Sequence, residues 1–344
     1  KKEDYHANLM TNPPIFKRKI LVELENLFDS GLRECSVIEG ARQVGKSFII
    51  EMFLKSKFES HITLDFTLNP ELKQIFDGNL DVDGIIRKIR AQFPEFNPVP
   101  GKTAIFLDEI QACPNARTSL KSFSLDGRYA VISSGSLLGI NYTKVPSYPV
   151  GYEHHMNLRS LDFEEFLWAM GIDEDAITYI RECISSKSPI DNFLLNKFNE
   201  YFRIFMTVGG MPAAVRSYLN NRDISDARTT HRNILSGYRN DIGKYSNERE
   251  RNKIFACFDS IPLQLSKKNK KFIYSDIKDV DSPSARKYRS SIDWIENAGI
   301  GSICTNLSEP KMPFEERGNG SAFNLHMNDT CLLLSMMGDD VAHV

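Results

Sequence analysis

The chain has 344 residues, which is enough for two or three domains that each bury a core. Its 43 Lys and Arg residues nearly balance its 45 Asp and Glu residues, so the net charge of −2 excludes a global attraction to nucleic acid or anionic lipid. No apolar run approaches the twenty or so residues that cross a bilayer, and the N-terminal stretch KKEDYHANLM lacks the apolar core of a signal peptide.

The cysteines indicate a reducing compartment. They are Cys35, Cys113, Cys183, Cys257, Cys304 and Cys331. Their wide spacing and the absence of a C-x-x-C pair argue against a disulfide framework or a zinc knuckle and favour buried thiols. We therefore expect a cytoplasmic protein with no membrane contact. Because the chain starts at Lys1 without a methionine and stops shortly after LLLSMM, we also expect a fragment of a longer chain.

The first half of the chain has the pattern of an α/β fold. After a lead-in over residues 1–15, FKRKILVELENLF carries apolar residues at helical spacing and predicts a helix. Short apolar runs that end in polar or glycine residues follow: CSVIEG, HITLDF, TAIFLDE and YAVISSG. Since helices or loops separate them, they predict a parallel sheet with crossover helices, in which sites gather at the carboxyl ends of the strands.

From about Gly151 the pattern becomes helical. Apolar residues three and four apart predict helices in AITYIRECI, NFLLNKFNEYFRIFMTV, AAVRSYL and TTHRNILSGYRNDI. Beyond Arg251 come a helix, the lysine-rich turn SKKNKK, the short run FIYSDI, the helix SARKYRSSIDWIENAG and a short extended pair, which is the order of a winged helix. The predicted divisions are a core over 16–150, a helical lid or linker over 151–250, a winged-helix domain over 251–310 and the start of a C-terminal region over 311–344.

Residues 40–47, GARQVGKS, match the phosphate-binding loop pattern G-x-x-x-x-G-K-[ST] at every fixed position. An apolar strand precedes the loop and an apolar helix follows it, as the pattern requires. Glycines let the backbone amides point at an anion, and the helix N-terminus adds partial positive charge. We predict that Lys46 reaches the β and γ phosphates of ATP and that Ser47 ligates Mg²⁺. The predicted nucleotide-binding residues are Gly40, Ala41, Arg42, Gln43, Val44, Gly45, Lys46, Ser47 and Phe48.

Two later strands end in side chains that suit the same site. TAIFLDEIQ carries an apolar strand into Asp108, which we expect to hold Mg²⁺ with Ser47, and into Glu109, which is placed to polarise the attacking water. The alternative is a strand that runs into a solvated acidic turn. YAVISSGS ends in Ser133, Ser134 and Ser136, whose hydroxyls would sense the γ-phosphate, unless this is only a strand that runs into a Gly-Ser turn.

Further stretches make a more specific signature than the loop alone: IFLDEIQACPNARTSLKSF, VISSGSLLGI, PVGYEHHMNLRSLDFEEFLWAMG, VGGMPAAV, YRNDIGKY, IPLQLSKKNKKFIYSDI and FNLHMNDTCLL. With GARQVGKS, they resemble the bacterial and archaeal P-loop ATPases of AAA type that carry a trailing domain of uncharacterised function. The resemblance implies an α/β fold: a P-loop NTPase core with a parallel sheet of the additional-strand type, then a helical region and a winged-helix domain. It makes Lys46 and Ser47 the Walker A residues, Asp108 and Glu109 the Walker B pair, and Ser134 part of the sensor region.

The chain departs from this family in two places. Tyr152 follows PVG where many relatives have an arginine, so an arginine acting on the γ-phosphate from there is in doubt. Arg42, Arg128 and Arg159 are alternatives that the sequence does not separate. The chain also stops near the point where relatives continue into a segment that can look like a nuclease, and it shows no PD-(D/E)xK pattern, so we predict no nuclease site. No guanine-reading N/T-K-x-D motif is present, which favours ATP.

A nucleic-acid contact is the main open alternative. In SARKYRSSIDWIENAG one helical face carries Tyr288, Ile292 and Ile295, and the other carries Arg286, Lys287, Arg289 and Ser290. This polar face would enter a DNA groove, with Lys267, Lys268, Lys270 and Lys271 near phosphates, or it is a solvated face that docks a protein. His154 and His155 point to opposite sides of an extended segment and suit no shared metal.

The leading hypothesis is a Mg²⁺-dependent ATPase in which Lys46, Glu109 and Ser134 act on the nucleotide and hydrolysis moves the attached helical and winged-helix parts. The rival is a nucleotide-gated switch with little turnover that binds DNA, a protein partner or a second copy of the chain. An inactive scaffold is the third alternative, against which the presence of both Walker motifs argues.

Overall fold

A computed structural model describes residues 16–31, 34–135, 151–245, 247–278, 280, 282–307, 312 and 318–338. These residues form two compact units. The first runs from Lys19 to Arg159 and takes in residues 297–299, and the second contains the other described residues. The predicted lead-in over residues 1–15 and the predicted site residue Ser136 lie outside the described residues.

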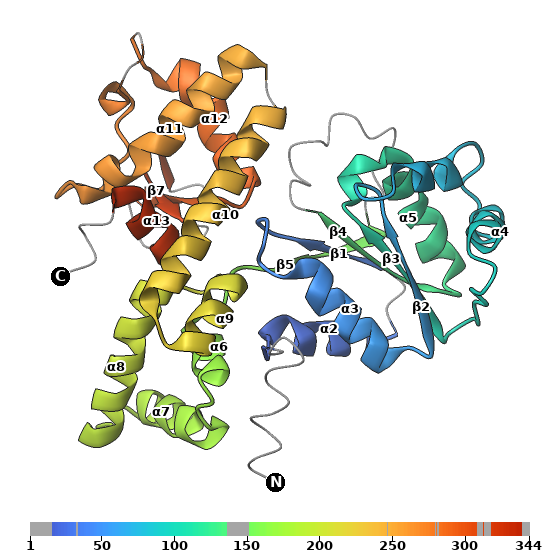
Figure 1. Ribbon diagram of the computed structural model, residues 1–344, viewed down its shortest axis with the longest axis horizontal. Coiled ribbons are helices and arrows are strands. Elements are labelled where there is room, and N and C mark those ends of the chain that lie inside the picture. Colours follow the sequence, from blue (N-terminus) through green and yellow to red (C-terminus); the bar gives the residue numbers. More distant parts are fainter. Residues whose placement is uncertain are drawn as a thin grey trace. The chain divides into compact units, whose positions relative to one another are not determined.

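The first unit is built on a five-stranded parallel sheet (Figure 1). Its strands are β1 (Cys35–Glu39), β2 (Ser60–Asp65), β3 (Thr103–Asp108), β4 (Ala130–Gly135) and β5 (Glu153–Asn157). The spatial order is β2-β3-β4-β1-β5, so β4 lies between β1 and β3, and Ile132 of β4 pairs with Ser36 and Phe106. The expected α/β fold with a parallel sheet of the additional-strand type is confirmed.

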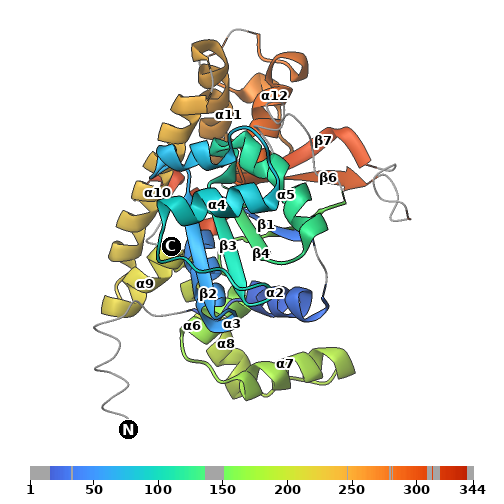
Figure 2. The ribbon, with the colours of Figure 1, turned by 90° about the vertical axis from the view of Figure 1, so that its right-hand side faces the viewer.

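Helices cover both faces of this sheet (Figures 1 and 2). They are α2 (Lys19–Asp29), α3 (Lys46–Lys57), α4 (Val82–Gln92) and α5 (Pro114–Asp126), with 3-10 turns η1 (Pro70–Phe76) and η2 (Ile110–Ala112). On one face Phe28 of α2 contacts Phe53 of α3, with ring centroids 5.5 Å apart. On the other, Ile85 of α4 and Leu120 of α5 join the buried cluster of Ile105.

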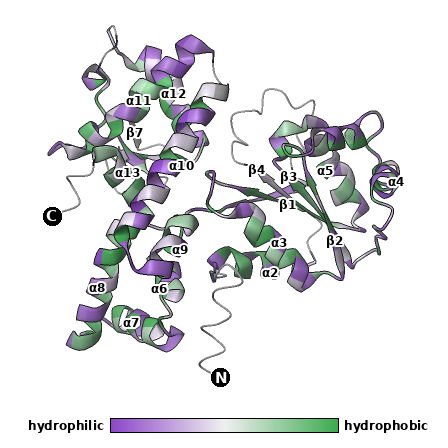
Figure 3. Cartoon of the chain, in the orientation of Figure 1, coloured by the Kyte–Doolittle hydropathy of each residue, from purple (hydrophilic) through white to green (hydrophobic). Residues whose placement is uncertain are grey.

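Strand β3 lies at the centre of this core. All six of its residues are buried, which explains why its sequence is a continuous apolar run rather than an alternating one (Figure 3). Strand β5 is different, because it is an edge strand in which only Met156 is buried. Its exposed, polar character is why the apolar pattern that identified the other four strands did not reveal it.

The second unit is mainly helical. It contains α6 (Phe163–Ala169), α7 (Glu174–Ser186), α8 (Asn192–Val208), α9 (Pro212–Asn221), α10 (Ile224–Tyr245), α11 (Glu248–Ser266), η4 (Tyr274–Asp276), α12 (Ala285–Asn297), β6 (Gly301–Leu307), β7 (Gly318–Met327) and α13 (Thr330–Met337). Strands β6 and β7 pair antiparallel. Several helices begin at an acidic N-cap, and Asp162 with Glu165 forms a complete capping box at α6.

The region after Arg251 contains helices followed by an antiparallel strand pair, in the order that the sequence predicts. The centre of the FIYSDI run is the 3-10 turn η4, and the Gln264 side chain donates to the Ile273 carbonyl and accepts from the Ile273 amide beside it. On α12, Tyr288 is buried and Lys287 is exposed, as the predicted two-faced helix requires. The winged-helix assignment and the domain boundaries stay predictions.

Two sequence expectations concern surfaces. No helix in the described part of the chain combines the length and apolarity needed to span a membrane. Five of the six free cysteines are buried, but Cys304 is exposed because it lies on the outward-facing part of β6, so the expectation of buried thiols is wrong for that residue.

Candidate functional site

The loop of residues 40–45 connects the carboxyl end of β1 to the start of α3. Its backbone enters conformations that favour glycine, with φ of 154° at Gly40 and 93° at Gly45. A Cβ atom on Gly40 would lie 2.1 Å from the carbonyl oxygen of Leu158. The Leu158 amide in turn donates to the Glu39 carbonyl at 2.8 Å. The entrance of the loop is therefore clamped against the chain that follows β5.

The buried Lys46 side chain donates hydrogen bonds to the backbone of its own loop. Only 6% of this residue is exposed, and its Nζ donates to the carbonyl oxygens of Gly40 at 2.9 Å and Ala41 at 2.8 Å. Burial lowers its pKa to about 8, and the nearby carboxylates of Glu109 and Asp108 oppose that shift. A polyphosphate would offer this ammonium charged acceptors, which bind it more strongly than neutral carbonyls do.

The carboxyl ends of β3 and β4 meet at Asp108 and Ser134. The buried Ser134 hydroxyl donates to Asp108 Oδ1, which also accepts the Glu109 amide at 3.1 Å. Glu109 has a left-handed backbone, with φ of 53°, which turns the chain out of the strand. Gln111 Nε2 then donates to Glu109 Oε2 at 2.5 Å. A strained backbone at the second carboxylate is typical of residues held in place for a function.

The structure thus brings most of the predicted residues to one edge of the sheet. Lys46 lies close enough to Asp108 and Glu109 for their charges to affect its pKa, and Ser134 joins them through Asp108. Ser47 and Phe48 form the exposed first turn of α3. The other loop residues divide into buried Ala41 and Val44, half-buried Gly40, Arg42 and Gly45, and exposed Gln43. Ser133 instead donates to the Ser36 carbonyl of β1 at 3.3 Å.

The structure also separates the three arginines. Arg128 forms ion pairs with Asp126 at 2.8 Å and Asp83 at 2.7 Å, just before β4 begins. Because the strands are parallel, this position lies at the opposite edge of the sheet from the loop. Arg42 belongs to the loop itself, and Arg159 follows the carboxyl end of β5. Arg128 is therefore removed from the candidates that would act on a phosphate.

Sequence reasoning missed a charged cluster that braces β5. Buried Arg117 of α5 pairs with Glu153 at 2.9 Å, and no local pattern could reveal a pair 36 residues apart. His155 lies between Glu39 at 2.9 Å and Glu153 at 3.1 Å, and these two carboxylates raise its pKa to about 9. His154 faces Glu34 instead, so the two histidines do have different partners.

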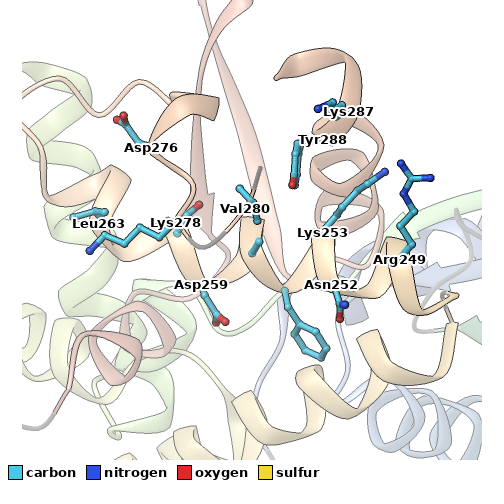
Figure 4. Close-up of a pocket in the computed structure, with 13 residues that line it drawn as sticks. Arg249, Asn252, Lys253, Asp259, Leu263, Asp276, Lys278, Val280, Lys287 and Tyr288 are labelled. Atoms are coloured by element: carbon cyan, nitrogen blue, oxygen red, sulfur yellow. The ribbon is translucent and has the colours of Figure 1, made fainter. Parts of the chain in front are cut away.

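A second concave feature lies within the second unit, between α11, α12 and the segment near residue 278 (Figure 4). Its volume is about 830 Å³. The charged side chains that line it are Arg249, Lys253, Lys278, Lys287, Asp259 and Asp276. Among the described residues that line the cavity, the basic ones outnumber the acidic ones.

The loop, the strand order and the paired carboxylates at the carboxyl edge define a P-loop nucleotide-binding protein. Two family models match the sequence: "AAA domain" over residues 32–167 and "Domain of unknown function (DUF8612)" over residues 199–342. The chain therefore contains an AAA domain followed by a domain of unknown function, in the order that the resemblance of its motifs implied.

A solved structure shows the same fold. The chain is similar to the Walker-type ATPase Paby2304 of Pyrococcus abyssi, with a TM-score of 0.55 and 14% identity over 94% of this chain and 96% of that one. It also matches the Aeropyrum pernix ORC1 protein, solved in complex with DNA, with a TM-score of 0.35 and 11% identity over 96% and 95% of the two chains. No curated protein matches the sequence.

Proposed function

We propose that the protein is a Mg²⁺-dependent ATPase whose first unit hydrolyses ATP and thereby changes the conformation of the second. One observation carries the proposal: buried Lys46 lies over its loop and beside the two carboxylates that end β3. A cation, a loop with glycine-dependent turns and two carboxylates together fit a nucleotide with its metal ion.

Each residue has a role in this proposal. The loop amides and Lys46 bind the phosphates, and Ser47 and Asp108 hold Mg²⁺, which neutralises charge on the β and γ phosphates when it is bound. Glu109 orients and polarises the attacking water. Ser134 bonds to Asp108, and in this proposal its hydroxyl also responds to the γ-phosphate. Adenine is favoured only by the family and by the absence of a guanine-reading motif.

The test is steady-state hydrolysis of Mg·ATP by the purified chain. Lys46→Ala should abolish nucleotide binding, whereas Glu109→Gln should keep binding and stop turnover. Lys55→Ala is the matched control for the first variant, because Lys55 lies on the same helix and is exposed. Exposed Glu95 provides the control Glu95→Gln for the second. Undiminished hydrolysis by Glu109→Gln would contradict the role of Glu109.

The proposed coupling needs a separate measurement. Both tryptophans, Trp168 and Trp294, belong to the second unit, so their fluorescence reports on that unit alone. If hydrolysis moves the second unit, ATP and ADP should change this fluorescence differently in the native chain and not in Lys46→Ala. Identical fluorescence in both nucleotide states would contradict the coupling while leaving the ATPase proposal intact.

A second candidate function is a nucleotide-gated switch that binds DNA. The basic cavity and the exposed basic face of α12 favour it, because both carry Lys287. Binding of labelled duplex DNA should weaken steeply with salt and change with ATP. Lys287→Glu should weaken it further, whereas Lys197→Glu, on exposed α8 outside the cavity, should not. No binding at low salt would leave a protein partner or a second copy of the chain as the partner to test.

A further inference from the structure

Three buried side chains with metal-ligating atoms meet inside the second unit. His231 comes from α10, Asp329 precedes α13, and Cys331 lies in the first turn of α13. A ring nitrogen, a carboxylate oxygen and the thiol sulfur of these residues all lie within 4.8 Å of one another. Helices α10 and α13 pack side by side, which brings together residues about a hundred positions apart in sequence (Figure 1).

His231 is the unexplained member of this cluster. It is fully buried, yet neither ring nitrogen makes a hydrogen bond of ordinary geometry with the described residues. The Val208 main chain lies near enough to affect its pKa without meeting that geometry. Burying an unsatisfied polar group costs about 1–3 kcal/mol, so a buried imidazole without a clear partner needs a reason.

Asp329 is held in place as metal-ligating carboxylates usually are. Its Oδ2 accepts the Gly210 amide at 2.8 Å, and its Oδ1 accepts the Cys331 amide at 3.0 Å. A Cβ atom on Gly209 would lie 2.4 Å from Oδ1, so this glycine of the VGGMP motif leaves room for the carboxylate. Hydrogen bonds of this kind orient a ligand and still leave lone pairs for an ion.

Cys331 adds a sulfur ligand on the same side. Its Sγ lies 3.3 Å from the Met206 carbonyl oxygen, to which the thiol donates, and it forms no disulfide. The sulfur is therefore available to an ion once the thiol proton is released.

We propose that His231, Asp329 and Cys331 bind Zn²⁺. Nitrogen, sulfur and oxygen ligands together suit zinc, whereas Mg²⁺ and Ca²⁺ prefer oxygen alone. Zinc ligand distances of about 2.0–2.3 Å place tetrahedral ligand atoms about 3.3–3.6 Å apart, so the cluster needs to close by at most about 1.5 Å on binding. The Met206 carbonyl oxygen is already at such a distance from Sγ and is a candidate for a fourth ligand.

The burial of the cluster assigns this ion a structural role. His231, Asp329 and Cys331 are exposed by 0%, 6% and 1%, so no substrate reaches them as a catalytic Cys-His-Asp group. The ion would tie α13 to α10 and to the end of α8, close to the turn that begins α9. The proposal does not depend on the nucleotide site, because every ligand belongs to the second unit.

The test is to treat the full chain with a chelator, add Zn²⁺ in slight excess, remove unbound metal by gel filtration and measure zinc by mass spectrometry. The native chain should retain one equivalent, and excess Mg²⁺ should not displace it. His231→Gln and Cys331→Ser should retain at least tenfold less. Cys257→Ser is the matched control, since Cys257 is also fully buried in the second unit and lies outside the cluster. It should bind zinc as the native chain does.

Cobalt keeps the test independent of variant folding. Co²⁺ added to the native chain and to Cys257→Ser should give a sulfur-to-metal charge-transfer band that is lost on adding Zn²⁺. Failure of the native chain to retain stoichiometric zinc, or zinc retention with no sulfur-to-cobalt band, would overturn the proposal. Equal retention by the native chain and both ligand variants would overturn it as well.

Discussion

Replacing Gly40 with alanine tests how the loop is clamped at its entrance. The new Cβ would lie 2.1 Å from the Leu158 carbonyl oxygen, whereas ordinary contacts begin at 3.4 Å. The oxygen would have to retreat by about 1.3 Å, well beyond the small adjustments that packed atoms tolerate. Leu158 cannot do so freely, because its own amide is bonded to the Glu39 carbonyl next to the glycine.

The expected cost has two parts. A φ of 154° lies in a region almost confined to glycine and strains an L-residue by roughly 1–3 kcal/mol, and the overpacking against Leu158 adds roughly 1–3 kcal/mol. Gly78→Ala is the control for a positive φ without a clash, because Gly78 has a φ of 79° and a Cβ there would meet nothing within 4 Å. Gly40→Ala should therefore destabilise the first unit by about 1–3 kcal/mol more than Gly78→Ala does.

Urea unfolding followed by circular dichroism measures this difference. Tryptophan fluorescence, which reports on the second unit, should show an unchanged midpoint for both variants. Binding of a fluorescent ATP analogue should weaken in Gly40→Ala alone, because only that change displaces the loop. Equal destabilisation by the two variants, with unchanged nucleotide affinity in both, would refute the clamp.

Three further predictions follow from the same unit. Because burial lowers the pKa of Lys46 to about 8, ATP affinity should fall by up to about tenfold per pH unit above that pH. Calorimetric titrations of the native chain measure this fall, and an affinity that stays constant as the pH rises would contradict it. The pKa of His155 is raised from 6.5 to about 9, so the contribution of this residue to folding stability is complete below pH 6.5 and is lost as the pH rises through about 9. The urea midpoint of the native chain should fall over that range, and the midpoint of His155→Gln should lack this fall. Ser134→Ala removes a buried hydrogen bond to the Asp108 carboxylate and should lower the free energy of unfolding by about 1.5–3 kcal/mol. Ser133→Ala should lower it by about 0.5–1.5 kcal/mol, because the Ser133 hydroxyl bonds a neutral carbonyl, and chemical denaturation measures both changes.

Most of the first unit was predictable because its signals are local. A phosphate-binding loop, a buried strand and a crossover helix each leave a contiguous pattern, and parallel strands place their carboxyl ends at one edge. Lys46, Asp108, Glu109 and Ser134 could therefore be grouped from sequence. Edge strand β5 could not be recognised in this way, because an exposed strand does not need apolar residues.

Arg128 shows that residues close in sequence can lie far apart in the fold. It lies only six residues before Ser134, yet the length of β4 carries these two residues to opposite edges of the sheet. Its partners Asp126 and Asp83 then hold it there. An arginine can face the phosphates only if it lies at the carboxyl end of a strand. The amino-acid composition around Arg128 does not show which end of β4 it occupies.

The sequence by itself determined the P-loop signature, the order of the buried strands and crossover helices, and the residues of the nucleotide loop, because each rests on neighbouring positions with fixed spacing. Only the tertiary structure decided that His231 meets Cys331, that Arg117 pairs with Glu153 and that Gly40 abuts Leu158. The six dispersed cysteines even argued against a zinc knuckle. Contacts of this kind depend on how helices and strands pack after they form, and packing brings together residues whose separation in sequence leaves no periodic trace.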